Sequence, residues 1–150
     1  MRIALFQPDI PQNTGNIFRL GACLGVSVDI IEPTGFIFDD KKFKRSAMDY
    51  IDHIDYKRHI DWKHFYKWVQ ENNFRLILMT TKTQQSFYTF QFQSTDILLF
   101  GSESSGVPDN IHQIVDYRLT IPMKKNLRSI NLSSSVAIVI GEGLRQTNII

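Results

Sequence analysis

The amino-acid sequence predicts a single α/β domain over residues 1–150, built on a mainly parallel sheet. Short apolar runs of strand length alternate with longer segments in which apolar residues recur at helical spacing. A chain of 150 residues with 43% hydrophobic and 21% charged residues suits one soluble domain with one core. In addition, three polar loops each follow an apolar run, which is where open α/β sheets bind ligands.

The first half of the chain contains two predicted strands and three predicted helices. Residues 2–7 form an apolar run that a proline ends, and residues 26–31 form a second run with a Pro-Thr-Gly break soon after it. Between these runs, residues 14–24 have helical spacing, an Asn-Thr pair available as N-cap, and a glycine after the last residue. We expect two further helices, a basic one at 39–50 and an aromatic one at 61–72.

The second half continues the alternation. Residues 74–80, 96–100 and 117–121 are predicted strands, and a short helix is predicted at 108–114, directly after a Gly- and Ser-rich loop. The apolar run 136–140 is long enough to belong to a buried closing helix. Strands that alternate with helices in this way favour a parallel sheet.

The closing helix is preceded by more polar side chains than a helix cap needs. Asn131 and Ser133 to Ser135 stand where the helix begins, and their side-chain oxygens can accept from free backbone N–H groups. One such residue is enough for capping. The surplus indicates a turn that holds a polar ligand or a tightly folded piece of backbone.

The three polar loops follow Gln7, Phe100 and Ile121. Because the carboxyl ends of parallel strands meet at one edge of a sheet, we expect the loops to form one site. The loop at 101–108 is no phosphate-binding P-loop, since Val107 and Pro108 replace the required Lys and Ser or Thr. It also lacks the first glycine of a hydrolase nucleophile elbow.

Two further kinds of site are excluded by spacing. The dinucleotide-binding glycine fingerprint does not follow the first predicted strand, and the four histidines form no metal-ligand pattern with the single cysteine, so we expect no metal. Cys23 lies in the apolar pattern of the first helix, and we expect a buried thiol without chemistry. No stretch approaches a membrane span or a signal-peptide core, which predicts a cytoplasmic protein without a membrane partner.

Basic residues are clustered although the net charge is small. The chain has 17 Lys and Arg against 15 Asp and Glu, a net charge of +2. A first cluster comprises Lys41, Lys42, Lys44 and Arg45, a second comprises Lys57 and Arg58, and a third, close to the third polar loop, comprises Lys124, Lys125 and Arg128. Clusters beside candidate site loops favour contacts with phosphate groups.

The polar loops resemble the three ordered motifs of the SPOUT-class RNA ribose 2′-O-methyltransferases. The matching segments are Pro-Gln-Asn-Thr-Gly-Asn-Ile-Phe-Arg-Leu at 11–20, Leu-Phe-Gly-Ser-Glu-Ser-Ser-Gly-Val-Pro at 99–108 and Ile-Pro-Met at 121–123, continued by Arg-Ser-Ile-Asn-Leu-Ser at 128–133 and Arg-Gln at 145–146. Within that class, the chain is most similar to the family that methylates the wobble nucleotide of tRNA, a cytidine or uridine. The resemblance covers essentially the whole chain.

The resemblance implies a C-terminal deep trefoil knot, S-adenosyl-L-methionine as the methyl donor, and an obligate homodimer with the active site at the interface. Knots are rare exceptions to the rules of chain connection, so no sequence pattern predicts one. The resemblance also implies a set of cofactor-binding residues, many of which act through backbone groups: Met79, Gly101, Glu103, Ile121, Met123 and Ser129.

The resemblance gives Arg19 a central catalytic part, with Ser129 and Asn131 as the other catalytic residues. Arginine stays protonated far above neutral pH and is therefore a poor proton acceptor. We hypothesise that Arg19 anchors the phosphate beside the target ribose and orients its hydroxyl. The expected tRNA contacts come from Arg19 and the basic clusters: Lys41, Lys42, Lys44, Arg45 and Arg128.

One departure from the family pattern lies in the closing helix, where Gly141 replaces a usual aromatic residue and Gly143 follows. Two glycines in a helix cost roughly 1 kcal/mol each relative to alanine, and we expect close packing, within the chain or against the partner subunit, to compensate. Two other functions remain open: a ribosomal RNA 2′-O-methyltransferase of the same fold, because the motifs encode cofactor and ribose chemistry, and a non-catalytic RNA-binding protein.

Overall fold

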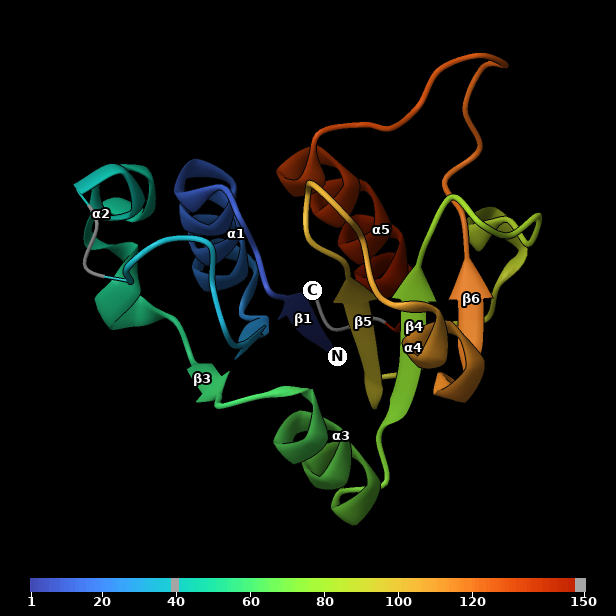
Figure 1. The fold of residues 1–150 in the computed structure, drawn as a ribbon, viewed down its shortest axis with the longest axis horizontal. Coiled ribbons are helices and arrows are strands. Elements are labelled where there is room, and N and C mark those ends of the chain that lie inside the picture. Colours follow the sequence, from blue (N-terminus) through green and yellow to red (C-terminus); the bar gives the residue numbers. More distant parts are fainter. Residues whose placement is uncertain (39–40, 148–150) are drawn as a thin grey trace.

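Six strands form one parallel sheet in the order β3-β2-β1-β5-β4-β6 (Figure 1). The structure is a computed structural model that describes residues 1–38 and 41–147. The predicted α/β fold with a mainly parallel sheet is confirmed. The strands are β1 Arg2–Phe6, β2 Ser27–Ile31, β3 Tyr56–His59, β4 Arg75–Met79, β5 Asp96–Phe100 and β6 Tyr117–Leu119.

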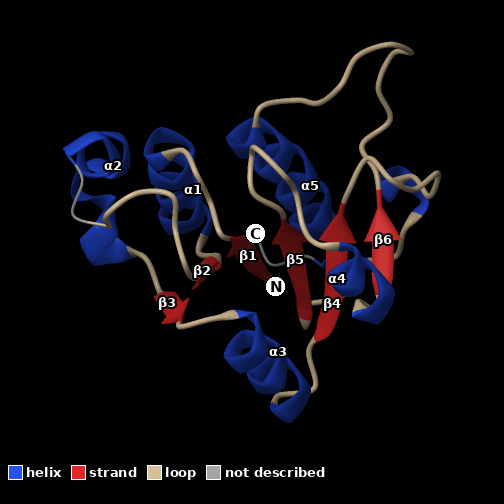
Figure 2. Cartoon of the chain, in the orientation of Figure 1, coloured by secondary structure: helices blue, strands red, loops and turns tan. Residues whose placement is uncertain are grey.

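Helices cover both faces of the sheet (Figure 2). One face packs against α1 Pro11–Leu24, α2 Lys41–Ala47 and α5 Leu132–Thr147, and the other against α3 Trp62–Glu71 and α4 Asp109–Ile114. Two short 3₁₀ helices, η1 Met48–His53 and η2 Phe87–Thr89, lie in connections. No helix in the described ranges has both the length and the apolarity needed to cross a membrane.

The two cores follow from the alternation of side chains along each strand. In β1, Ile3 and Leu5 join the core under α1 and α5, while Ala4 and Phe6 join the core under α3 and α4. Every residue of the central strand β5 is buried. This double burial explains why the strands read as continuous apolar runs.

Most predicted elements agree with the structure to within a few residues. The three exceptions are the edge strand β3, the basic helix at 39–50 and the start of the first helix. The edge strand β3 was not predicted, because three of its four side chains are exposed and it has no apolar run. The basic helix predicted at 39–50 is α-helical over 41–47 and continues as the 3₁₀ helix η1, while residues 39–40 lie outside the described part of the chain.

The first helix begins earlier than the spacing predicted. It starts at Pro11, whose missing N–H costs nothing in a first turn, and Ile10 occupies the N-cap without a side-chain hydrogen bond. The expected capping by Asn13 or Thr14 is therefore wrong. Both residues lie within the helix and their side chains are buried in the protein. Asn13 is therefore available for contacts with other loops.

Two expectations about packing also differ from the structure. Cys23 is exposed, because it lies on the face of α1 that points away from the sheet. A Cβ atom at Gly141 would meet no atom of this chain within 4 Å, so close packing inside the chain does not explain that glycine. Close packing occurs instead at Gly143, beside the side chain of Met1.

Gly15 sets how closely α1 approaches α2, and replacing it tests this packing. A Cβ atom at Gly15 would lie 2.8 Å from the backbone nitrogen of Ala47 and would also overlap Ser46. We expect Gly15→Ala to lower the free energy of unfolding by about 1–3 kcal/mol, because the two helices must separate. Urea unfolding measures this, with Cys23→Ala on the exposed face of α1 as control; equal stability of the two variants would contradict the packing argument.

Candidate functional site

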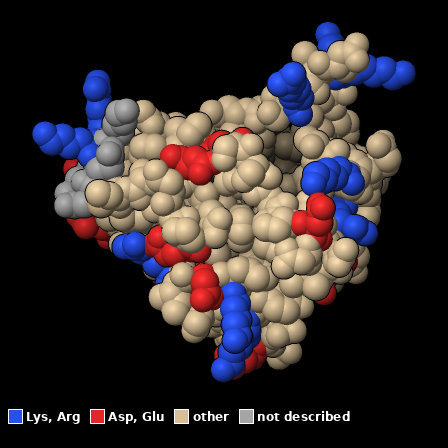
Figure 3. Space-filling view, viewed as in Figure 1, with Lys and Arg blue, Asp and Glu red and all other residues tan. Residues whose placement is uncertain are grey.

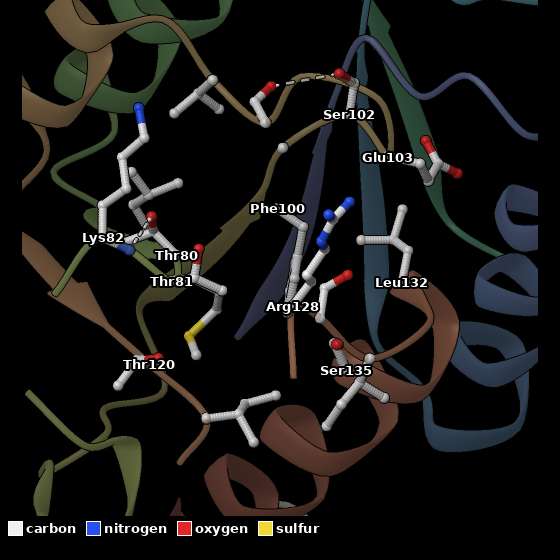
Figure 4. A pocket seen from close by; sticks show the side chains of 18 of the residues that line it. Thr80, Thr81, Lys82, Phe100, Ser102, Glu103, Thr120, Arg128, Leu132 and Ser135 are labelled. Carbon is white, nitrogen blue, oxygen red and sulfur yellow. Dashed lines mark hydrogen bonds between the residues drawn. The ribbon is translucent and has the colours of Figure 1, made fainter. Parts of the chain in front are cut away.

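The loops that follow β1, β4, β5 and β6 surround one cavity at the carboxyl edge of the sheet (Figure 4). Its volume of about 510 Å³ is that of a site for a small molecule or cofactor. The lining residues come from all four loops, from the strand ends and from the start of α5, as the fold class predicts. The expected convergence of the three polar loops is confirmed.

The cavity has an apolar floor and a polar rim. Strand ends and the third loop supply the floor, which includes Leu78, Met79, Phe100 and Ile121. Figure 4 shows Thr80, Thr81 and Lys82 along one wall, with Glu103 and Leu132 on the opposite wall. Such a cavity suits a ligand with a flat apolar part and polar ends.

The loop after β5 is closed by two glycines. The backbone N–H of Ser102 donates to Gly106 O at 3.1 Å, and the N–H of Gly106 donates to Ser102 O at 2.9 Å. Gly106 has a φ of 68°, and a Cβ atom at Gly101 would lie 2.6 Å from the Cα of Gly106. The loop therefore needs glycine at both positions.

Glu103 joins this loop to the loop after β1. Its carboxylate accepts from the backbone N–H groups of Asp9, at 2.8 Å, and Ile10, at 3.3 Å. It also accepts from the side-chain amide of Asn13 at 3.1 Å. Because the carboxylate already accepts three hydrogen bonds, its main role in this structure is to hold the two loops together.

Asn13 extends the connection to the third loop. Its side-chain oxygen accepts from the amide of Asn131 at 2.9 Å, while its amide nitrogen donates to Glu103. The Asn13 residue is only 5% exposed. One buried amide thus links all three motif loops, a role that the sequence reading did not assign to it.

Asn131 is the N-cap of α5. Its Oδ1 atom accepts from the backbone N–H of Ser133 at 2.9 Å and of Ser134 at 3.3 Å. The polar cluster before the closing helix therefore contains one cap, as expected. The other polar residues are not all needed as caps. Ser135, for example, lines the cavity together with Ser129.

The structure brings most of the predicted site residues together. Those that line the cavity are Met79, Gly101, Glu103, Ile121, Met123, Arg128, Ser129 and Asn131.

Arg19 is absent from the described cavity lining of its own chain. It is exposed, and its guanidinium carbon lies 5.3 Å from the centre of the Tyr50 ring. Arg19 is eight positions after Pro11, the first residue of α1, which places it about 12 Å along the helix axis. Because α1 begins at Pro11, Arg19 lies well beyond the first turn of the helix.

The clustered basic residues that are expected to contact tRNA lie in two regions. Lys41 and Arg45 are exposed on α2, whereas the side chains of Lys42 and Lys44 lie outside the described part of the structure. A second region lies on the exposed loop between β6 and α5, which includes Arg128. Figure 3 shows Lys and Arg side chains at two upper corners of the molecule, near α2 and on this projecting loop.

Lys82 and His112 also line the cavity, although the sequence analysis did not single them out. Burial lowers the pKa of His112 from its ordinary value, and the nearby positive charge of Lys82 lowers it further, while Asp109 acts in the opposite direction. Burial and Lys82 therefore favour the neutral imidazole. No group of His, Cys, Asp and Glu in the described ranges has an arrangement that could hold a metal ion.

Comparison with known proteins identifies the family. The model of the SpoU rRNA methylase family matches residues 1–141. The chain belongs to this family. It is 46% identical to a tRNA (cytidine(34)-2′-O)-methyltransferase of Beijerinckia indica over 144 residues, which cover 96% of this chain and 90% of the relative.

Solved structures of the family have the same fold. A structure described as giving insights into the 2-OH methylation of C/U34 on tRNA has a TM-score of 0.92 and 35% identity, covering 97% of this chain and 94% of the other. The SpoU methyltransferase AviRb of Streptomyces viridochromogenes, solved in complex with the cofactor AdoMet, has a TM-score of 0.89 and 22% identity. That match covers 97% of this chain and 57% of the other.

The Asn13 link predicts coupled stability effects. Asn13→Ala leaves the Asn131 amide and part of the Glu103 carboxylate without partners, so we expect a loss of about 1–3 kcal/mol in the free energy of unfolding. Adding Glu103→Ala should cost less than the sum of the single changes, by at least about 0.5 kcal/mol, because the two residues share a contact.

Urea unfolding of the two single variants and the double variant measures this coupling. Gln12→Ala, on the exposed neighbouring position, is the matched control. Strict additivity would mean that the amide does not hold the loops together.

Proposed function

We propose that this chain transfers a methyl group from S-adenosyl-L-methionine to the ribose 2′-hydroxyl of the wobble nucleotide of tRNA. The observation that carries the proposal is the convergence of all three motif loops on one cavity of cofactor size. The high identity to a tRNA (cytidine(34)-2′-O)-methyltransferase over nearly the whole chain supports tRNA as the substrate. The proposal includes one SPOUT domain over residues 1–150 and a cytoplasmic location, where tRNA is modified.

The residues of the cavity fit the proposed cofactor. The apolar floor around Met79, Phe100 and Ile121 suits a flat purine ring, and the backbone groups around Gly101 and the hydroxyl of Ser129 suit its polar edges. The tight closure of the 101–106 loop leaves backbone rather than bulky side chains at that wall. When bound, the cofactor supplies an activated methyl group on a positively charged sulfur.

The protein's own task is then alignment and removal of a proton. Methyl transfer to a hydroxyl needs the two reactants in line and an acceptor for the hydroxyl proton. We assign to Arg19 the binding of the phosphate beside the target ribose. Ser129 and Asn131 then hold the surrounding loops in position. Asn131 supports this part of the proposal, since it caps α5 and contacts Asn13 at the same time.

The position of Arg19 supports a homodimer with a shared active site. Arg19 does not line the described cavity of its own chain, so a catalytic Arg19 would come from a second subunit. Two exposed helix faces are available for such an assembly: that of α1, and that of α5, where Ile138 is 40% exposed and Gly141 has open space. A partner helix at Gly141 would explain the missing aromatic side chain.

The trefoil knot also belongs to the proposal. After β6, at the edge of the sheet, the chain returns to its middle, where α5 packs against α1 and β5. We propose that this return passes through the loop formed by the preceding segment. The described loop lengths and the strand order are compatible with this path (Figure 1).

A second candidate is a ribosomal RNA 2′-O-methyltransferase, which the description of the matching family favours. Mapping of ribose methylation in total RNA, with and without the protein, separates the candidates. We expect loss of the mark at the wobble nucleotide of tRNA in cells that lack the protein. A mark lost from ribosomal RNA instead would support the second candidate, and an unchanged map would argue for a non-catalytic RNA-binding protein.

Complementation between two inactive variants tests the shared active site. Arg19→Ala removes the phosphate anchor but leaves the cavity intact, whereas Ser135→Trp fills the cavity but keeps Arg19. If each site combines one cavity with Arg19 of the partner subunit, mixed dimers contain one complete site, and random mixing should restore about a quarter of the wild-type rate.

The measurement is tRNA methylation after the variants are unfolded and refolded together. Each variant refolded alone is the control and should stay inactive. An inactive mixture with a normal proportion of mixed dimers would place Arg19 in the site of its own chain and contradict the shared-site proposal.

A conservative change separates two roles of Arg19. Arg19→Lys keeps the charge but loses the planar fork that binds a phosphate through two hydrogen bonds. We expect turnover to fall at least about tenfold, while cofactor affinity stays close to that of the wild type. Calorimetric binding of S-adenosylhomocysteine gives the second quantity, and its loss would show that Arg19 acts on the cofactor instead.

A further inference from the structure

Lys82 places a positive charge at the β4 end of the cavity, and none of the proposed cofactor contacts involves this residue. Lys82 follows β4 after Thr80 and Thr81, and all three residues line the cavity. Figure 4 shows them together on the wall opposite Glu103. The side chain of Lys82 is 63% exposed and is therefore accessible to a ligand that enters the cavity.

The charges of the lining favour an anion. Among the described lining residues, Lys82 and Arg128 are cations and Glu103 is the single carboxylate. Glu103 already accepts three hydrogen bonds from the loop after β1 and from Asn13. Its carboxylate is thus bound to the loop after β1 and to Asn13 rather than to Lys82.

Among the described residues, Lys82 forms an ion pair with Asp109, and that pair is weak. Its ammonium nitrogen lies 3.2 Å from Oδ1 of Asp109, whose side chain is 86% exposed. Exposed pairs of this kind contribute little because water screens them. An anion in the cavity can therefore replace Asp109 at small cost.

The backbone around Lys82 is fixed by local hydrogen bonds. The N–H of Lys82 donates to Oγ1 of Thr80 at 3.1 Å, and the N–H of Thr80 donates to Leu119 O at 2.9 Å. Because the Thr80 oxygen accepts the bond from Lys82, its hydroxyl hydrogen remains available for a ligand.

We propose that Lys82 and the hydroxyls of Thr80 and Thr81 form an anion subsite at the β4 end of the cavity. The inference rests on the proposed function for the source of the anion. That source is either the amino-acid carboxylate of the cofactor or a phosphate of the tRNA. Both present oxygen atoms that an ammonium and hydroxyl groups bind by charge-assisted hydrogen bonds.

Binding of two adenosine ligands separates the sources. S-adenosylhomocysteine carries the carboxylate, whereas 5′-methylthioadenosine lacks the whole amino-acid part. If Lys82 binds the carboxylate, Lys82→Gln should weaken S-adenosylhomocysteine about tenfold and leave methylthioadenosine unchanged. If Lys82 binds a phosphate, both ligands should bind as in the wild type, while tRNA binds more weakly and its salt dependence falls by about one unit.

Three further variants sharpen the experiment. Lys82→Arg keeps the charge and should retain most of the affinity. Asp109→Asn removes the competing carboxylate and should leave anion affinity equal or up to about threefold higher. Lys67→Gln is the matched control, because Lys67 is an exposed lysine of α3 that also pairs with a carboxylate.

Isothermal titration calorimetry and filter binding of tRNA give these affinities. The proposal is overturned if Lys82→Gln binds S-adenosylhomocysteine and tRNA within twofold of the wild type, or if Asp109→Asn weakens the same ligand that depends on Lys82. A wild-type protein that binds neither adenosine ligand would contradict the proposed function itself, which is a different result from an unaffected Lys82 variant.

Discussion

The side-chain amide of Asn13 is the contact on which the rest of the site depends. It donates to Glu103 and accepts from Asn131, so it connects the loops after β1, β5 and β6 in a buried position. An amide has both a donor and an acceptor end, and neither a carboxylate nor an aliphatic side chain of similar size could make both contacts. Three of the four loops that wall the cavity are therefore held together through this one group.

The sequence predicted the sheet and the place of the site for physical reasons. Strands buried on both faces must be apolar throughout, so β1, β4 and β5 were readable as runs. The edge strand β3 was not predicted, because three of its four side chains face water. Caps depend on local geometry. α1 begins at its proline, three residues before the predicted start, so Asn13 lies inside the helix and not at its cap.

The site was predictable in outline but not in its internal contacts. The resemblance to known motifs gave residues of the lining, which the three-dimensional convergence of the loops explains. It did not reveal that Glu103 is occupied by backbone donors, or that Lys82 and His112 face the same cavity. These contacts join residues that are distant in sequence and whose types are common on any surface, so spacing alone has no signal for them.

The projecting loop between β6 and α5 is held at both ends but not between them. At one end the N–H of Thr120 donates to Gln85 O at 2.8 Å, and at the other Asn131 is bound to Asn13 at 2.9 Å. Residues 124–127 between these points are exposed and are not part of the cavity lining. If the loop contacts RNA as proposed, substitutions there change the RNA surface that it meets without moving the cavity walls. Substrate choice can therefore diverge within this fold while the chemistry stays constant.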